Sequence, residues 1–155
     1  MIPLTLPAAA SQLATSVDEL WRSVSELVLT VEEDRPEGLD LAAVDEFSER
    51  VIEMQGSVAS ARDLLRPGAP LVPVLPEVAA SLDDAHRRYW RDMRGYAAVA
   101  ALRGASRRHG GGLPAWRGAV EASAERCEAP FARTAEAVNA CWQEICHASM
   151  PRRSS

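Results

Sequence analysis

The segment from His86 to Tyr96 holds the densest group of side chains able to bind a charged partner. It reads His-Arg-Arg-Tyr-Trp-Arg-Asp-Met-Arg-Gly-Tyr. Arginine pairs bidentately with carboxylates or phosphates, and its guanidinium group stacks on aromatic rings. The candidate binding residues, which we call the Arg/aromatic strip, are Arg87, Arg88, Tyr89, Trp90, Arg91 and Arg94, continued by Arg103, Arg107 and Arg108. At helical spacing, Arg87, Arg91 and Arg94 are expected to share one face.

Three interpretations of this strip stay open. Its arginines can pair with acids of the first half of the chain, such as Glu46, Glu49 and Glu53, or through self-association. They can instead dock an acidic protein surface, or bind nucleic acid or another polyanion. The sequence pI of 5.2 disfavours nucleic acid, because domains that bind it are usually basic throughout. We therefore expect a partner protein with an acidic surface, or self-association.

Metal chemistry has weak support in the sequence. Glu144–His147 reads E-x-x-H and Asp83–His86 reads D-x-x-H, the kind of pair that di-iron helical bundles use. However, Ile145 holds the core position of its stripe, so His147 lies well round the helix. The two histidines would also be offset by roughly 20 Å along an antiparallel helix pair. We predict no metal site and no cofactor.

Several classes of enzyme site are missing from the sequence. The chain contains no lysine, which excludes a Walker A lysine, a Schiff-base lysine and a lysine general base. Neither a GxSxG elbow nor an HExxH motif is present. We therefore predict that the protein is not an enzyme.

The cysteines and the N-terminal segment indicate a cytoplasmic protein. The three cysteines have no framework spacing, and Cys127 and Cys141 fall on an apolar helical stripe, as small core residues do. Residues Met1–Ala10 have no basic region and resemble a signal peptide poorly. The longest apolar stretch in a helical segment, Tyr96–Leu102, is far shorter than the roughly 20 residues of a membrane span.

The elements that must position the strip are predicted to be helices. Apolar residues recur at steps of three and four in four segments, and the alternation of a strand appears in none of them. The four stripes run over Leu13–Val31, Val44–Leu65, Leu82–Ala100 and Trp116–Ile145. Near-heptad spacing predicts left-handed, near-antiparallel packing. The expected fold is all-α, a four-helix bundle of long amphipathic helices.

Turn-forming residues separate these stripes. Pro36 and Gly38 mark the first turn, Pro67-Gly68 ends the second helix, and Gly110–Gly112 ends the third. Pro130 lies inside the fourth stripe. Because proline removes a backbone donor and clashes one turn back, it should kink or split that helix.

A proline recurs at every third position between the second and third helices, at Pro67, Pro70, Pro73 and Pro76. Polyproline II has three residues per turn, and ten such residues extend roughly 30 Å. We predict a Pro-rich crossover that runs along the bundle and sets the third helix parallel to the second. A bound PxxP ligand is the alternative, and the Val and Leu residues between the prolines favour the structural interpretation.

The charge of the chain is divided at this linker. Residues 1–77 carry 14 acidic side chains against 5 arginines, a net charge of −9, whereas residues 78–155 carry 8 acids against 12 arginines, a net charge of +4. We predict a single domain, 1–155, made of an acidic hairpin (11–66), the Pro-rich linker (67–76) and a basic hairpin (77–149).

These observations lead to one expected function and two alternatives. The leading expectation is a non-catalytic interaction protein, such as an adaptor, an assembly factor or a small regulatory subunit, that uses the Arg/aromatic strip. The first alternative is a bundle that binds a small molecule or polyanion near Tyr89, Trp90 and Arg94 or at the Pro130 kink. The second alternative is a metal-dependent enzyme.

Overall fold

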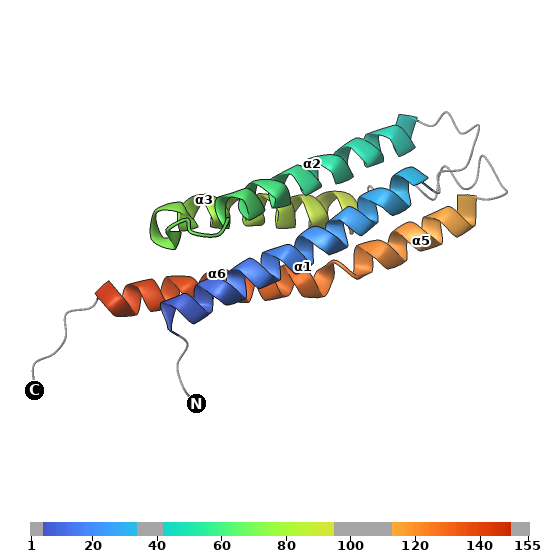
Figure 1. Ribbon diagram of the computed structural model, residues 1–155. Coiled ribbons are helices and arrows are strands. Elements are labelled where there is room, and N and C mark those ends of the chain that lie inside the picture. The colour runs from blue at the N-terminus through green and yellow to red at the C-terminus, as the bar shows by residue number, and fades with distance from the viewer. Residues whose placement is uncertain (1–4, 34–41, 95–112, 150–155) are drawn as a thin grey trace, which may run out of the picture.

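The computed structural model describes residues 5–33, 42–94 and 113–149, and every regular element within them is a helix. The elements are α1 (Leu6–Glu33), α2 (Ala42–Leu64), α3 (Leu71–Arg88), the π-helix η1 (Tyr89–Met93), α5 (Leu113–Glu125) and α6 (Glu128–Ser149). Because η1 continues α3, and α5 and α6 together form the fourth helix of the bundle, which we call the fourth position, the fold is the predicted all-α four-helix bundle (Figure 1).

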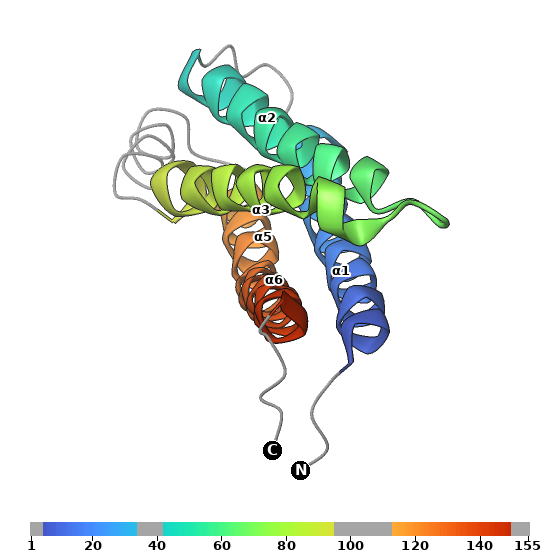
Figure 2. The same ribbon diagram turned by 90° about the vertical axis from the view of Figure 1, so that its left-hand side faces the viewer.

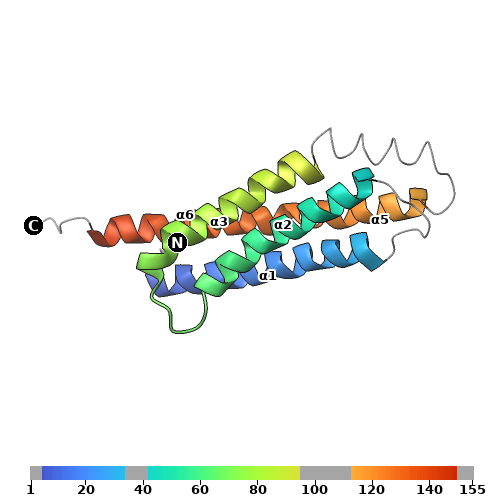
Figure 3. The ribbon, with the colours of Figure 1, turned by 90° about the horizontal axis from the view of Figure 1, so that it is seen from above.

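The helices form two layers, with α2 and α3 packed over α1, α5 and α6 (Figures 1 and 2). Neighbouring helices are antiparallel, and the colours of α1, α2 and α3 run in alternating directions in Figure 3. The side-chain contacts that fix these directions are Asp18–Arg62 and Ser25–Gln55 between α1 and α2, Arg50–Asp92 and Ser57–Asp84 between α2 and the α3–η1 helix, and Glu19–Arg133 and Glu26–Arg126 between α1 and the fourth position.

The core is built from the predicted apolar stripes. All six stripe residues of α1, from Leu13 to Val31, are buried. In the other helices the stripe positions that are buried are Val44, Phe47, Val51, Met54, Val58, Ala61, Leu82, Ala85, Tyr89, Met93, Trp116, Val120, Ala124, Cys127, Phe131, Thr134 and Cys141. Leu65, Val138 and Ile145 are partly buried against them. Burial of one face per helix is what the near-heptad spacing required.

Helix α1 begins at Leu6, seven residues before the first stripe position. Thr5 precedes it, and its Oγ1 accepts a hydrogen bond of 3.4 Å from the backbone N–H of Ala8. This satisfies one of the first N–H groups of the helix, which have no helical acceptor. The added turns bury Ala9 in the core.

The prediction of an extended Pro-rich crossover is wrong. Only residues 65–70 separate α2 from α3, and they form a tight turn in which Gly68 has φ of +86°. Pro70 is the N-cap of α3, and Pro73 is its third residue. A backbone N–H has no acceptor in the first turn of a helix, so proline is tolerated there. Pro70 and Pro73 therefore fit a helix start as well as they fit polyproline II, whereas Pro76 lies inside α3.

Because the turn is short, α3 returns antiparallel to α2 rather than parallel to it, as Arg50–Asp92 and Ser57–Asp84 show. Leu75 is fully buried, although it lies in the segment assigned to the linker. Of the apolar residues between the prolines, Leu75 is buried and Leu71 and Val74 are partly buried, all on a helix, whereas Val72 is exposed.

The predicted break near Pro130 is confirmed. The fourth stripe is divided into α5 and α6 at Arg126 and Cys127, and Pro130 is the third residue of α6. At the break the N–H of Cys127 donates to the carbonyl oxygen of Ala124 at 3.1 Å, a tighter turn than an α-helix makes. Proline in the first turn of α6 removes no helical hydrogen bond, so α6 starts without strain.

Candidate functional site

The described part of the Arg/aromatic strip lies on the last turn of α3 and on η1. The side chains of Arg87 and Arg91 are 74% and 66% exposed, and half of Trp90 is exposed. The side chains of Arg88 and Arg94 are only 28% and 30% exposed. The structure thus presents three strip residues to solvent and directs two arginines into seams between helices. Arg103, Arg107 and Arg108 lie outside the described residues.

The π-helix changes the direction in which the last strip residue faces. The N–H of Arg94 donates to the carbonyl oxygen of Tyr89, five residues back, at 3.0 Å. This wider turn rotates later residues relative to an α-helix. The guanidinium of Arg94 lies 3.4 Å from the carboxylate of Glu125 and 3.1 Å from that of Glu128. Arg94 therefore faces the fourth position of the bundle and does not share the exposed face with Arg87 and Arg91.

Arg88 connects α3 to α2. Its Nε donates to Asp84 at 2.9 Å and its Nη1 donates to Glu53 of α2 at 2.6 Å. The hydrogen bond to Asp84 is the main reason that the pKa of Arg88 is raised. Ser57 Oγ also donates to Asp84, at 2.6 Å, and together with Arg88 it lowers the pKa of that carboxyl. Pairing inside the bundle, one of the three interpretations, accounts for Arg88.

Asp92 is a site residue that the sequence analysis missed. Its side chain is fully buried, and it accepts hydrogen bonds from Arg50 Nη1 at 3.0 Å and from Arg91 Nε and Nη2 at 2.9 Å each. Burial acts to raise the pKa of Asp92, but the hydrogen bonds and charges of Arg91 and Arg50 outweigh it and the pKa is lowered. In the sequence, Asp92 could have been recognised only as the single acidic residue between Arg87 and Arg94.

Tyr89 is both a position of the predicted apolar stripe and a candidate binding residue, and the structure places it in the core. Its ring is fully buried, and its hydroxyl donates to the carbonyl oxygen of Ala124 at 2.8 Å. The Tyr89 ring lies 4.9 Å from that of Phe131 and 5.5 Å from that of Trp90. Burial raises the pKa of its hydroxyl group. The buried Tyr89 ring packs against Trp90 and is not accessible to a partner.

Trp90 is held in place by His86 while half of its surface stays exposed. The indole Nε1 donates to His86 Nε2 at 2.7 Å. The His86 ring in turn stacks on Phe131 of α6, with 5.2 Å between centroids and 23° between planes. The indole therefore has a fixed orientation and a satisfied N–H, and its free face is apolar.

A groove of about 270 Å³ lies between α3 and α6, next to His86. It is lined by Ala79, Leu82, Asp83 and His86 on α3 and by Phe131, Thr134, Ala135 and Val138 on α6. Leu82, Phe131 and Thr134 are buried at its floor, whereas Asp83 and Ala135 are exposed at its edges. The sequence could not reveal this groove, because its walls come from two segments about fifty residues apart.

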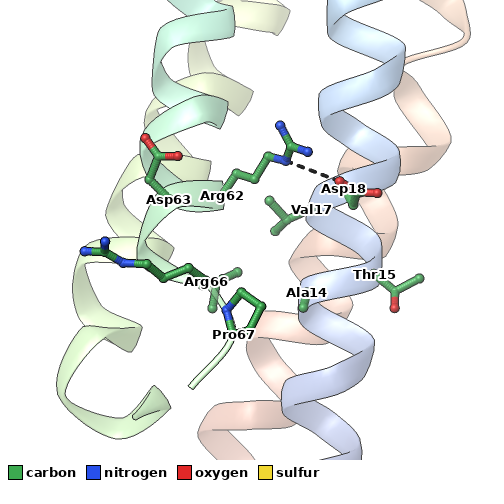
Figure 4. A pocket seen from close by; sticks show the side chains of 9 residues that line it. Ala14, Thr15, Val17, Asp18, Arg62, Asp63, Arg66 and Pro67 are labelled. Atoms are coloured by element: carbon green, nitrogen blue, oxygen red, sulfur yellow. Dashed lines mark ion pairs between the residues drawn. The ribbon is translucent and has the colours of Figure 1, made fainter. Parts of the chain in front are cut away.

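A second cleft, of about 730 Å³, lies between the first half of α1 and the end of α2 (Figure 4). Arg62 crosses it with Nε 3.2 Å from Asp18 Oδ1, and its guanidinium lies 5.3 Å from the centre of the Trp21 ring. In Figure 4 the guanidinium of Arg66 is directed away from Asp18. Ligand sites have polar groups that converge, and those of this cleft are paired or diverge.

Within residues 5–33, 42–94 and 113–149, no group of three or more His, Cys, Asp or Glu side chains could hold a metal ion. Cys127 and Cys141 are buried free thiols and Cys146 is an exposed one. Burial raises the pKa of Cys127 to about 12 and also raises that of Cys141. Over the same residues, no helix has the length and apolar character needed to cross a membrane.

No protein-family model matches the chain, and no curated protein or solved structure is significantly similar to it.

Proposed function

We propose that this protein is a non-catalytic interaction protein, such as an adaptor, an assembly factor or a small regulatory subunit. Its binding surface is the exposed part of the Arg/aromatic strip, Arg87, Trp90 and Arg91. The partner surface is either acidic and on another protein, or belongs to a second copy of this chain.

One observation carries this proposal. Trp90 is half exposed although His86 fixes its orientation, and exposed arginines precede and follow it on the same helix. Tryptophan and arginine are the residues most often found at the energetic centres of protein interfaces. A rigid indole also loses little side-chain entropy when a partner covers it.

The test is capture of partners by immobilised wild-type protein from its native extract, followed by mass measurement of the intact complex. The variant carrying Arg87→Glu and Arg91→Glu should retain less than about a tenth of the captured partner, because it opposes an acidic surface with like charge. Arg94 is left unchanged because it pairs with Glu125 and Glu128 inside the bundle. Because Arg91 also pairs with buried Asp92, the single variant Arg87→Glu, which alters only an exposed pair with Asp83, is measured beside the double variant and should also lose capture.

The matched control reverses the charge of Arg22 and Arg66, two exposed arginines elsewhere on the bundle. Arg22 pairs with Asp18 four residues earlier, as Arg87 does with Asp83. This control should capture as much partner as the wild type. Equal capture by the Arg87/Arg91 variant, with helicity unchanged by circular dichroism, would refute the proposal.

The groove between α3 and α6 favours a second candidate function, the binding of a small apolar molecule. Its volume of about 270 Å³ is near the lower end of ligand pockets, which span roughly 300–1,000 Å³. A ligand that binds the folded state raises the melting temperature. A thermal-shift screen with small aromatic compounds should then find one that stabilises the protein. Ala135→Trp, which fills the groove, should remove that stabilisation. The absence of any stabiliser would exclude this function.

A further inference from the structure

The groove between α3 and α6 extends beyond the residues that line its deepest part. Among the described residues, the exposed large apolar side chains are Leu29, Ile52, Val72, Trp90 and Trp142. Val72 precedes Ala79 by seven residues, Trp90 follows His86 by four, and Trp142 follows Ala135 by seven. Residues four or seven apart share a helix face. Three of the five exposed apolar side chains therefore extend the groove at its ends.

The size of this face suits a weak protein interface. From Val72 to Trp90 it is roughly 27 Å long, at 1.5 Å per helical residue, and two adjacent helices are about 20 Å wide. The resulting area, roughly 540 Å², is below the 800 Å² or so that each partner of a standard interface buries. An association through this face is expected to have a dissociation constant in the micromolar range.

The charged residues beside the groove can pair with the same residues of a second copy of the chain. Asp83 and Arg87 are four residues apart on α3, 3.2 Å from one another, and 65% and 74% exposed. In a twofold interface, residue i of one copy contacts residue j of the other and j contacts i. When the α3 helices of two copies pack antiparallel about the midpoint of this pair, each Asp83 faces the Arg87 of the other copy.

The same register matches shapes as well as charges. With residue 85 at the centre, Trp90 of the second copy lies level with Ala79 and Ala80 of the first. Since His86 lies beside Phe131 and the helices are antiparallel, that level on α3 corresponds to Ala137 and Val138 on α6, whereas Ala135 is level with Leu82. The position that receives the large indole thus lies between Ala79 and Val138, within one helical turn of Ala135, as in the packing of side chains into holes between helices.

We propose that the partner of this surface is a second copy of the chain, which docks Trp90 into the α3–α6 groove and pairs its Arg87 with Asp83 across a twofold axis. This inference rests on the proposed function and names the partner of the same surface.

Sedimentation velocity of the purified protein tests it. The mass should rise from that of one chain, 16.8 kDa, at about 1 μM to that of two chains at about 100 μM. Trp90→Ala, which removes the inserted side chain, and Ala135→Arg, which places a charge in the groove, should each leave a monomer at the higher concentration. Ala122→Arg, a matched change at an exposed alanine of α5, should leave the dimer unchanged.

A charge swap tests the register. Arg87→Asp alone places two carboxylates against each other and should weaken the dimer at least about tenfold. The double variant Asp83→Arg with Arg87→Asp reverses both charges and should restore most of the wild-type affinity. A structural defect in α3 would not be repaired by the second change. Failure of the double variant to dimerise, with helicity intact, overturns the register.

The outcomes also separate this inference from the proposed function. A wild-type protein that stays monomeric at about 100 μM excludes the second copy as partner at micromolar affinity. If capture of another protein is then lost with Arg87→Glu and Arg91→Glu, the proposed function stands with that protein as partner. A dimer that neither Ala135→Arg nor Arg87→Asp weakens excludes the groove.

Discussion

At the scale of single residues, Asp92 determines how Arg91 of the strip is held. It is a buried carboxylate that accepts hydrogen bonds from α2 through Arg50 and from its own helix through Arg91. An uncompensated buried charge is costly, so the carboxylate needs both arginines. The pairing ties η1 to α2 and restricts the orientation of Arg91 beside the exposed Trp90.

Asp92→Asn should therefore destabilise the fold. The amide is neutral and cannot accept from both guanidinium groups as a carboxylate does, so the free energy of unfolding should fall by about 1–3 kcal/mol. Urea denaturation monitored by circular dichroism measures this change. Asp83→Asn, at an exposed acid of α3, is the matched control and should have little effect. Equal stability of the two variants would contradict the role assigned to Asp92.

The cysteines should differ in reactivity because the thiolate is the reactive species. Burial raises the pKa of Cys127 to about 12 and also raises that of Cys141, whereas Cys146 is exposed. Iodoacetamide at mildly alkaline pH should add one adduct to the native protein, on Cys146, and three after unfolding. Mass spectrometry counts the adducts, and Cys146→Ser should remove the native one. A native adduct on Cys127 would show that its part of the core opens readily.

At the scale of elements, two glycines test the backbone assignments of α2 and of the turn that follows it. Gly56 lies inside α2 with nothing within 4 Å of the position of an added Cβ, so Gly56→Ala should stabilise the protein by about 0.5–1 kcal/mol. Gly68 has φ of +86°, which alanine adopts with strain, so Gly68→Ala should destabilise it by about 1 kcal/mol.

Thermal or urea unfolding of both variants measures the two changes, and each serves as the control for the other because the substitution is the same. If Gly68→Ala were neutral, the turn between α2 and α3 would differ from the one described.

The helices and their buried faces could be predicted from the sequence because burial sets the spacing of apolar residues along each helix. The stripe from Leu13 to Val31 is an example, and the break at Pro130 followed from the missing N–H. The start of α3 could not be predicted, because Pro70 and Pro73 suit the N-cap and first turn of a helix as well as an extended segment, and Pro76 lies inside the helix. Apolar spacing also fits both the π-turn at Tyr89 and an α-helix, so the π-turn gave no signal.

The candidate site was predictable in part. Residue type identified Arg87, Trp90 and Arg91, but their exposure depends on neighbours that are distant in the sequence. Arg88 is held by Glu53, 35 positions earlier, and Arg94 by Glu125, 31 positions later. No single-sequence pattern specifies such pairs, because they depend on how the helices are arranged.

At the scale of the whole molecule, residues of the acidic half of the chain form ion pairs with residues of the basic half across the seams between helices. Glu53 pairs with Arg88 across the α2–α3 seam, and Glu26 pairs with Arg126 across the seam between α1 and the fourth position. Arg50 pairs in the opposite sense, from the acidic half to Asp92 in the basic half. Exposed pairs of this kind contribute little individually, so we assign the pH dependence of stability mainly to buried Asp92.

Stability should fall in acid. The pKa values of Asp92 and Asp84 are lower in the folded protein than the ordinary value of 3.8. These carboxyl groups bind protons more readily when the chain unfolds. Their contribution is therefore present above about pH 4 and is lost as the pH falls through the lowered folded-state values. Urea midpoints between about pH 6 and about pH 2 measure this loss.

Asp92→Asn should make the same profile shallower, since residue 92 then no longer titrates. An identical acid slope in this variant and in the wild type would show that other carboxyl groups cause the loss.

The pairing of the first helix with the last also affects how the chain folds during synthesis. Glu19 meets Arg133 across 114 positions, whereas α2 and α3 are joined by a turn of a few residues. Local contacts form early, and contacts between distant segments wait for the chain between them. As the ribosome releases the chain from its N-terminus, the α2–α3 hairpin can close while α1 still lacks α6. Part of the apolar stripe of α1 then stays exposed until α6 has been synthesised.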